Sequence, residues 1–124
     1  MAVEDFDELF AALRPLLERH AGGSLAVVRD EPDDYQVQTN RTGPSGTYMW
    51  FGAVQTRASH VSLHLMPVYS HPDLLGGVSD ELRERLQGKG CFNLTPQEAT
   101  PQLLGELSEL VDLGVERYRA DGLA

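Results

Sequence analysis

The chain has 124 residues, of which 41% are hydrophobic and 23% charged, and its formal net charge is −9. This length and composition predict one domain over residues 1–124 with its own hydrophobic core, and they exclude a disordered chain. The negative charge excludes a domain that binds nucleic-acid phosphates, because such domains need a basic surface. Cationic partners or metal ions fit the charge better, although solubility alone also explains it.

The cysteine count and the apolar runs indicate where the protein works. Cys91 is the single cysteine, so no disulfide can form within the chain, and this pattern is typical of a reducing compartment. The N-terminal segment lacks the basic and apolar regions of a signal peptide. The apolar runs are far shorter than the ~20 residues that a helix needs to cross a bilayer. We therefore expect a cytoplasmic protein with no membrane partner.

The first third of the chain predicts a helix and two strands. Apolar residues at helical spacing predict a helix from about Val3 to His20, and Pro15 should kink or divide it. Short strands are expected from Leu25 to Arg29 and from Tyr35 to Asn40, joined by an acidic turn.

The centre of the chain predicts an antiparallel hairpin from Tyr48 to Gln55 and from His60 to Met66, ended by Pro67. Side chains alternate between the two faces of a strand. If Thr56 pairs with Ser59, one face is core and carries Tyr48, Trp50, Val54, Val61, Leu63 and Leu65. The other face carries Met49, Phe51, Ala53, Gln55, His60, Ser62, His64 and Met66. This second face is either covered by another element or open to a ligand.

The last part of the chain predicts helices around one further strand. The expected elements are a helical turn from His71 to Leu75, a helix from Ser79 to Gln87 capped by Gly88, a strand from Cys91 to Leu94, and a long helix that starts near Thr95 or Thr100 and ends near Ala120. The expected fold class is therefore α+β. It has an N-terminal helix, an antiparallel sheet of about five strands, a short helix and a long C-terminal helix packed on one sheet face.

Two motifs carry a resemblance to a known family. They are HLMPVY at residues 64–69 and LRERLQGKGCFN at residues 82–93, followed by a helix that ends in ERYR. With this spacing, the chain beyond about Phe51 resembles the bacterial YdhG-like family of unknown function. The resemblance implies a compact α+β domain with an antiparallel sheet. It also implies a possible role in iron delivery, since some relatives have been proposed as frataxin-like iron chaperones.

Two acidic clusters are candidate ligands for iron or another divalent metal. The first-helix cluster is Glu4, Asp5, Asp7 and Glu8, and the turn cluster is Asp30, Glu31, Asp33 and Asp34. Carboxylates bind hard cations, so the two clusters could form one site if they lie on one surface. Acidic residues at a helix start and in a turn are equally explained by the helix dipole and by solvation. Both interpretations stay open, and apart from such a metal we expect no cofactor.

The histidines of the hairpin do not form a metal chelate. His60 and His64 are four residues apart on one expected strand, which separates them by ~13 Å. His64 alone is a candidate hydrogen-bonding group in a pocket on the second sheet face. The alternative is a partly buried structural histidine.

The segment Gly88-Lys89-Gly90 is a candidate anion-binding loop, but it does not have the P-loop spacing. A helix cap with an exposed lysine explains it as well. Cys91 has no histidine nearby in sequence and is expected to pack as a small apolar residue. No established catalytic motif is present, so the sequence does not support an enzyme, and Cys91 with Lys89 is the weakest of the candidate sites.

Two functional hypotheses follow from the sequence. The first is a non-enzymatic domain that binds a small molecule or a protein on the second sheet face. Its candidate residues are Gln55, His60, Ser62, His64, Tyr69 and Lys89. The second is a frataxin-like carrier of iron or another divalent metal that uses the acidic clusters. Tyr48, Trp50 and Tyr69 are expected in the core, with a ligand cavity near Pro67 as the alternative.

Overall fold

The computed structural model describes residues 5–23, 25–42 and 48–122. The strands are β1 (Leu25–Glu31), β2 (Asp34–Thr42), β3 (Tyr48–Thr56), β4 (Val61–Leu65), β5 (Leu86–Gln87) and β6 (Cys91–Leu94). The helices are α1 (Phe6–Glu18), α2 (Met66–Ser70), α3 (Asp80–Glu84) and α4 (Pro101–Ala120), with the 3₁₀-helices η1 (Pro72–Gly77) and η2 (Pro96–Glu98). The predicted α+β class with a long C-terminal helix is confirmed.

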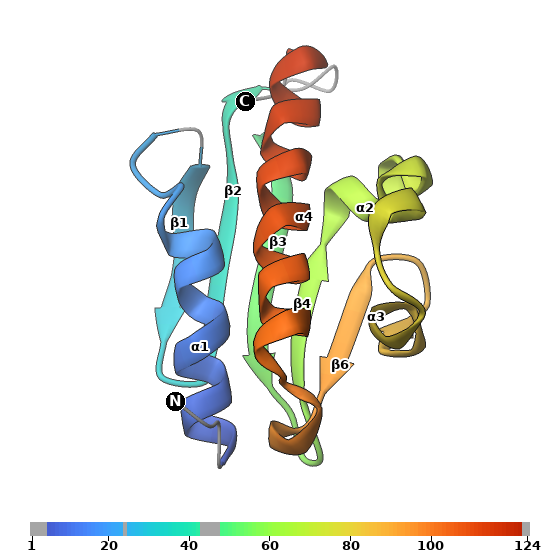
Figure 1. Cartoon of the computed structure of the whole chain (residues 1–124). Coiled ribbons are helices and arrows are strands. Elements are labelled where there is room, and N and C mark those ends of the chain that lie inside the picture. Colours follow the sequence, from blue (N-terminus) through green and yellow to red (C-terminus); the bar gives the residue numbers. More distant parts are fainter. Residues whose placement is uncertain (1–4, 24, 43–47, 123–124) are drawn as a thin grey trace.

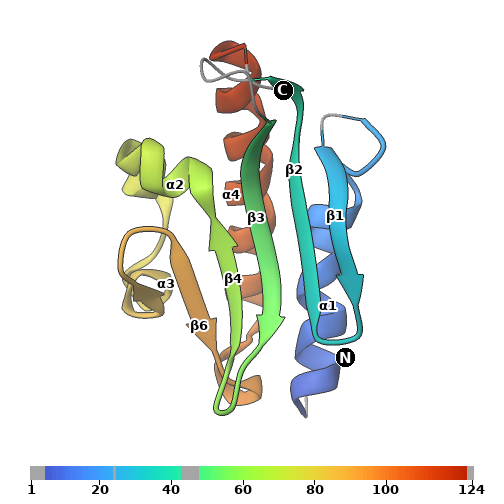
Figure 2. The same cartoon turned by 180° about the vertical axis from the view of Figure 1, so that it is seen from behind.

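The described strands form one antiparallel sheet in the order β1-β2-β3-β4-β6-β5. Figures 1 and 2 show that α1 and α4 lie side by side on one face of this sheet and leave the opposite face open. The short helices α2, η1 and α3 form a group beside β4 and β6. The molecule therefore has a helix-covered face, an open strand face and a helical edge.

The hydrophobic core lies between the sheet and the two long helices. Leu9, Leu13 and Leu17 of α1 are fully buried, and so are Leu107 and Val111 of α4. Their spacing of three or four residues places them on one side of each helix. Each such side chain stabilises the fold by about 1.5–3 kcal/mol relative to an exposed position. This burial determines which side of each helix faces the sheet.

Helix α1 differs in two ways from its prediction. It begins at Phe6, where the side chain of Asp5 accepts a 2.8 Å hydrogen bond from the backbone N–H of Glu8 and caps the helix. It also continues through Pro15 to Glu18 as one helix. Pro15 is on the exposed side, so the buried leucines on the other side hold the turn in place despite the missing backbone donor.

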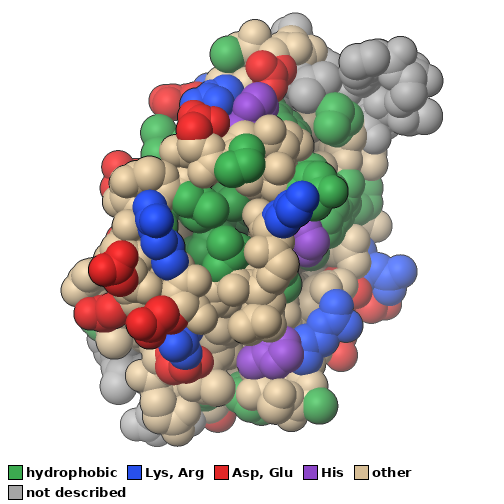
Figure 3. All heavy atoms as spheres, turned by 90° about the vertical axis from the view of Figure 1, so that its right-hand side faces the viewer, with side chains coloured by type: hydrophobic (Ala, Val, Ile, Leu, Met, Phe, Trp, Pro, Cys, Tyr) green, Lys and Arg blue, Asp and Glu red, His purple; other side chains and the backbone are tan. Residues whose placement is uncertain are grey.

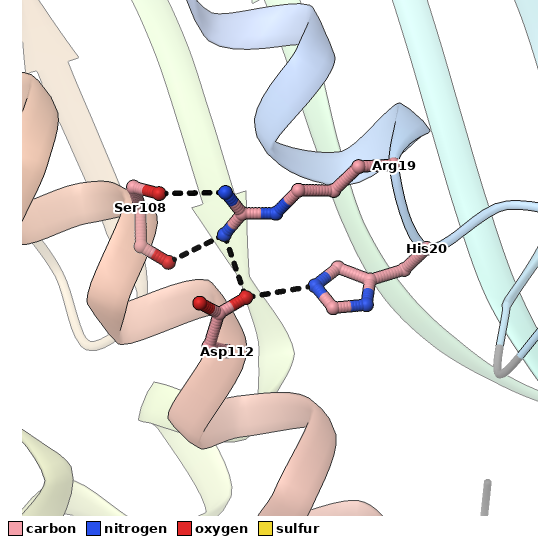
Figure 4. A network of polar contacts seen from close by, with 4 residues as sticks. All are labelled: Arg19, His20, Ser108 and Asp112. Carbon is pink, nitrogen blue, oxygen red and sulfur yellow. Dashed lines mark hydrogen bonds and ion pairs between the residues drawn. The ribbon is translucent and has the colours of Figure 1, made fainter.

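A polar cluster joins the end of α1 to the middle of α4 (Figure 4). Arg19 donates to the Ser108 hydroxyl at 2.7 Å, to the Ser108 carbonyl at 2.8 Å and to the Asp112 carboxylate at 2.6 Å. His20 Nε2 lies 2.9 Å from the same carboxylate oxygen. These contacts fix the end of α1 against α4 just before the chain turns into β1.

The β2–β3 ladder contains an irregularity that exchanges two predicted side chains. Val37 pairs with Gly52 but Gln38 pairs with Trp50, so Phe51 is an extra residue in β3. Phe51 therefore lies in the core, with its ring 5.6 Å from that of Tyr118, and Trp50 lies on the open face. The predictions of Trp50 on the core face and Phe51 on the open face were wrong, because strict alternation fails at a bulge.

The remaining core side chains of the hairpin follow the prediction. Val54, Val61, Leu63 and Leu65 are all buried. Thr56 pairs with Val61 instead of Ser59. A register shift of two residues keeps every side chain on its face, which is why the faces were right although the pairing was not. The side chain of Tyr48 lies outside the part of the chain whose side chains are described.

The segment after the hairpin contains elements that the sequence did not predict. Helix α2 starts directly after β4 and has Pro67 in its first turn, where a missing N–H costs nothing. Helix α3 ends at Glu84, and the short strand β5 follows and pairs with β6. Gly88, with φ of +68°, is therefore in the β5–β6 turn and does not cap a helix. The six strands observed exceed the five expected because β5 was assigned to the helix.

Candidate functional site

The open face of the sheet carries two cross-strand rows of side chains near its centre. One row runs through Gln36, Ala53, His64, Cys91 and Gln87, which are partners in successive ladders. The next row contains Gln55, Ser62 and Asn93. Residues in such rows are neighbours on one face. Of the predicted site residues, Gln55, Ser62 and His64 therefore do share this face.

His64 is positioned by two glycines that bring neighbouring backbone close to it. A Cβ at Gly52 would lie 2.3 Å from the His64 carbonyl oxygen, and a Cβ at Gly90 would lie 2.8 Å from the Leu65 carbonyl oxygen. Neither distance is possible for a real side chain, so both positions require glycine. The same Cβ position at Gly90 is 3.6 Å from His64 Nε2. The imidazole therefore lies against the turn that contains Lys89.

The imidazole of His64 is half-buried and rests against Trp50. The two ring centroids are 4.7 Å apart at an interplanar angle of 63°, an edge-to-face contact. Burial lowers the pKa of His64 below its ordinary value of 6.5, so the ring is neutral at pH 7. Within the described residues the ring makes no hydrogen bond to another side chain or backbone group. A neutral imidazole can donate from one nitrogen and accept at the other.

Tyr69 and Lys89 border the His64 region on the side of the short helices. Tyr69 is 53% exposed, so the expectation that it lies in the core was wrong, because it belongs to the unpredicted helix α2. Lys89 Nζ lies 5.6 Å from the centre of the Tyr69 ring. A Cβ at Gly90 would lie 3.4 Å from the Cβ of Tyr69, as well as 3.6 Å from His64 Nε2. Tyr69 and His64 therefore both lie close to Gly90. Figure 3 shows this edge of the molecule, where a histidine and a basic side chain lie together beside hydrophobic groups. We call Trp50, His64, Tyr69 and Lys89 the His64 corner.

Lys89 differs from most of the described arginines in its contacts. It is the only lysine of the chain. Arg14, Arg19, Arg29, Arg85 and Arg117 each form an ion pair with a carboxylate. Lys89 contacts no carboxylate among the described residues. Its ammonium group lies over the Tyr69 ring instead. Its charge is therefore free for a ligand in a protein that is otherwise acidic.

Cys91 is closer to a histidine than the sequence indicated. It has no histidine nearby in sequence, but it pairs directly with His64 across the β4–β6 ladder. The two residues are far apart in sequence, and only the strand register brings them together. The thiol nevertheless donates to the side-chain oxygen of Asn93 at 3.3 Å, and Ser62 donates to the same oxygen at 2.9 Å. The thiol of Cys91 is therefore oriented toward Asn93.

This arrangement does not favour nucleophilic catalysis by Cys91. Activation of the thiol by His64 would require the imidazole to take up its proton and then to stabilise the thiolate as a cation. The burial that lowers the pKa of His64 opposes a charged imidazole. The face instead offers hydrogen-bonding groups on rigid strands, which is typical of a binding surface.

Three of the predicted site residues lie away from the corner, and one of them is Ser62, in the row of Gln55 and Asn93. His60 is in the β3–β4 turn, where its Nδ1 lies 3.3 Å from the Ser59 hydroxyl. Gln55 is one row nearer the same turn, and its amide donates to Asp34 at 3.2 Å. The structure brings His64, Tyr69 and Lys89 together with Trp50, and it places Cys91 opposite His64 in the β4–β6 ladder. The sequence did not predict that Trp50 and Cys91 neighbour His64, because this depends on the bulge in β3 and on the β4–β6 register.

The acidic clusters are largely engaged in contacts within the protein. Asp5 caps α1, Asp30 pairs with Arg14 at 2.9 Å, and Glu31 pairs with Arg29 at 3.2 Å. Asp34 accepts from Gln36 at 3.0 Å. Among the residues that the structure describes, no three acidic, histidine or cysteine side chains are close enough to hold a metal ion.

Asp7, Glu8 and Asp33 lie on exposed positions of α1 and the β1–β2 turn, and Glu4 lies outside the described residues. Figure 1 shows that the start of α1 and the β1–β2 turn lie at the same end of the molecule. The iron or divalent-metal site therefore stays a prediction.

A cavity of about 300 Å³ lies outside the open face, between η1 and α4. Within the described ranges, no helix is long and apolar enough to cross a membrane.

Comparison with known proteins gives no relative. The chain matches no protein-family model, and no curated protein and no solved structure matches it. The class that the fold defines is an α+β domain with an open antiparallel sheet. The YdhG-like resemblance stays a prediction, and the functional argument rests on the residues alone.

Proposed function

We propose that this protein is a non-enzymatic binding domain that uses the open sheet face, with the His64 corner as its recognition site. The single observation that carries the proposal is the position of Lys89. It is the only lysine, contacts no carboxylate among the described residues, and lies over an exposed tyrosine next to an imidazole that makes no hydrogen bond there. Exposed aromatic and cationic groups on rigid elements are typical of binding surfaces.

The chemistry of the corner favours a ligand with an acidic group and a flat apolar group. The Lys89 ammonium and the imidazole N–H are donors suited to a carboxylate or phosphate. The rings of Tyr69 and Trp50 provide aromatic surface beside them. One nearby acceptor is already occupied, because the Asn93 side-chain oxygen accepts from both Ser62 and Cys91. A small aromatic acid, or an acidic peptide with an aromatic side chain, matches this set.

A titration with small aromatic ions tests the proposal. Trp50 is the only tryptophan, so its fluorescence reports on the corner without labelling. We expect benzoate to give a saturable change, and benzylammonium and benzyl alcohol to give none at the same concentrations. Lys89→Gln should weaken benzoate binding by about tenfold, the effect of losing ~1.4 kcal/mol.

Two variants serve as controls for this titration. Arg57→Gln removes an exposed cation from the β3–β4 turn, away from the corner, and should leave the affinity unchanged. Tyr69→Ala should weaken binding by removing the aromatic surface under Lys89. Equal affinity for benzoate and benzylammonium, or an unchanged affinity in Lys89→Gln, would contradict the proposal.

A further inference from the structure

A separate hollow lies on the other side of the short helices, between η1 and α4. Its volume of about 300 Å³ is at the lower end of the range for small-molecule pockets. Four apolar side chains line it: Leu74, Val78, Leu110 and Leu113. Leu110 is buried, but Leu113 is 39% exposed, one of the few large apolar side chains that the described surface shows. The hollow therefore has an apolar lining that reaches solvent.

The only basic side chain that lines the hollow is already neutralised. Arg117 donates to both carboxylate oxygens of Asp73, at 3.2 and 2.7 Å. This paired geometry is the strongest that an arginine forms with a carboxylate. It joins α4 to η1 at one end of the hollow and leaves no free cation in its lining.

Two further carboxylates line the hollow and have no cation. Glu106 accepts from the backbone N–H of Ser79 at 2.6 Å and from its hydroxyl at 2.8 Å, which fixes the carboxylate without neutralising it. Glu109 has no hydrogen bond or ion pair with any described residue. The two are three residues apart on α4, and so are Leu110 and Leu113, which puts all four on neighbouring positions of one helix side.

We propose that this hollow binds an organic cation that joins an ammonium group to an apolar stem. The stem would lie on Leu110 and Leu113, and the ammonium would lie between Glu106 and Glu109. An alkylammonium fits because the lining contains three carboxylates and one neutralised arginine. The same group occurs at the end of a lysine side chain and in free alkyl amines. The inference is independent of the His64 corner, which selects the opposite charge.

The test is a titration with n-hexylammonium followed by backbone amide shifts in NMR spectra. We expect saturable shifts in η1 and in the part of α4 from Glu106 to Arg117. Neutral n-hexanol and anionic hexanoate should not saturate, because neither compensates the carboxylates. Glu109→Gln should weaken n-hexylammonium binding by about fivefold, the effect of losing ~1 kcal/mol for an exposed ion pair.

Glu116→Gln is the matched control, since Glu116 is also exposed on α4 but does not line the hollow. It should bind like the original chain. The proposal is overturned if Glu109→Gln binds equally well, if n-hexanol saturates the same residues, or if the shifts lie elsewhere. A short lysine peptide that binds more tightly than n-hexylammonium supports the proposal with a protein as the source of the cation. The reverse order supports it with a small amine.

Discussion

Single residues hold the His64 corner in its geometry, and glycines do so most directly. A Cβ at Gly90 would lie 2.8 Å from the Leu65 carbonyl oxygen. The backbones of these two residues are already joined, because the Leu65 N–H donates to the Gly90 carbonyl oxygen at 2.7 Å. A side chain here would push β6 away from β4. Lys89 and Cys91 flank this glycine, so the placement of both depends on it.

Gly90→Ala is therefore expected to destabilise the protein. The added methyl group has no space, and overpacking of this kind costs about 1–3 kcal/mol. The free energy of unfolding in urea measures the effect. Gly76→Ala is the control, because a Cβ at Gly76 meets no atom within 4 Å and should change stability by less than about 0.5 kcal/mol. Equal stabilities of the two variants would show that the strands can separate without cost.

The burial of His64 predicts a dependence of stability on pH. Its pKa is below 6.5 in the folded protein, so the unfolded chain binds more protons as the pH falls through 6.5. The stability associated with neutral His64 is therefore fully present above pH 6.5 and is lost as the pH falls toward the folded pKa. Unfolding free energies between about pH 8 and pH 5 should fall less in His64→Gln than in the original chain. Parallel curves for the two proteins would contradict this.

At the scale of the elements, regular stretches could be predicted and irregular ones could not. The spacing of Leu103, Leu107, Leu110 and Val111 predicted α4, because apolar residues three or four apart match the helical period. The run from Tyr48 to Gln55 predicted β3, because it is rich in aromatic and β-branched residues. The bulge at Phe51 depends on the β2–β3 pairing, which no local pattern encodes. The short strand β5 was not predicted, because two residues are too few to show the alternation that marks a strand.

The candidate site shows the same limit. His64 was chosen from its strand face, Lys89 from its glycine-flanked loop and Tyr69 from its place after Pro67, and the structure brings the three together. Trp50 and Cys91 join them only through strand register, which depends on contacts between distant segments. The sequence held a weak signal of the exchange between Trp50 and Phe51, since both residues are large and aromatic. Either of them is therefore compatible with the core face or with the open face.

The contact between α1 and α4 carries a prediction at this scale. Arg19→Ala removes three hydrogen bonds to Ser108 and Asp112. Because Arg19 and Asp112 are both well exposed, we expect a loss of only about 1 kcal/mol in the free energy of unfolding. Arg57→Ala, on the exposed β3–β4 turn, should cost less. If Arg19→Ala is as stable as Arg57→Ala, the cluster does not hold the two helices together.

At the scale of the whole molecule, charge is distributed unevenly over an acidic surface. The net charge is −9, and most described arginines are paired with carboxylates. Lys89 has no carboxylate partner among the described residues and lies over the Tyr69 ring, at the border of the open sheet face. The hollow beside α4 has the opposite character, with carboxylates over an apolar lining. The two surfaces are therefore expected to select ligands of opposite charge.

The most direct test of the account is a map of the benzoate titration by backbone amide shifts. The account predicts saturable shifts confined to Trp50, His64, Tyr69 and the segment from Lys89 to Cys91, and their loss in Lys89→Gln. It also predicts no response of this segment to n-hexylammonium. Shifts spread over the surface, or centred on α4 or on the β1–β2 turn, would contradict the assignment of the open sheet face as the binding site.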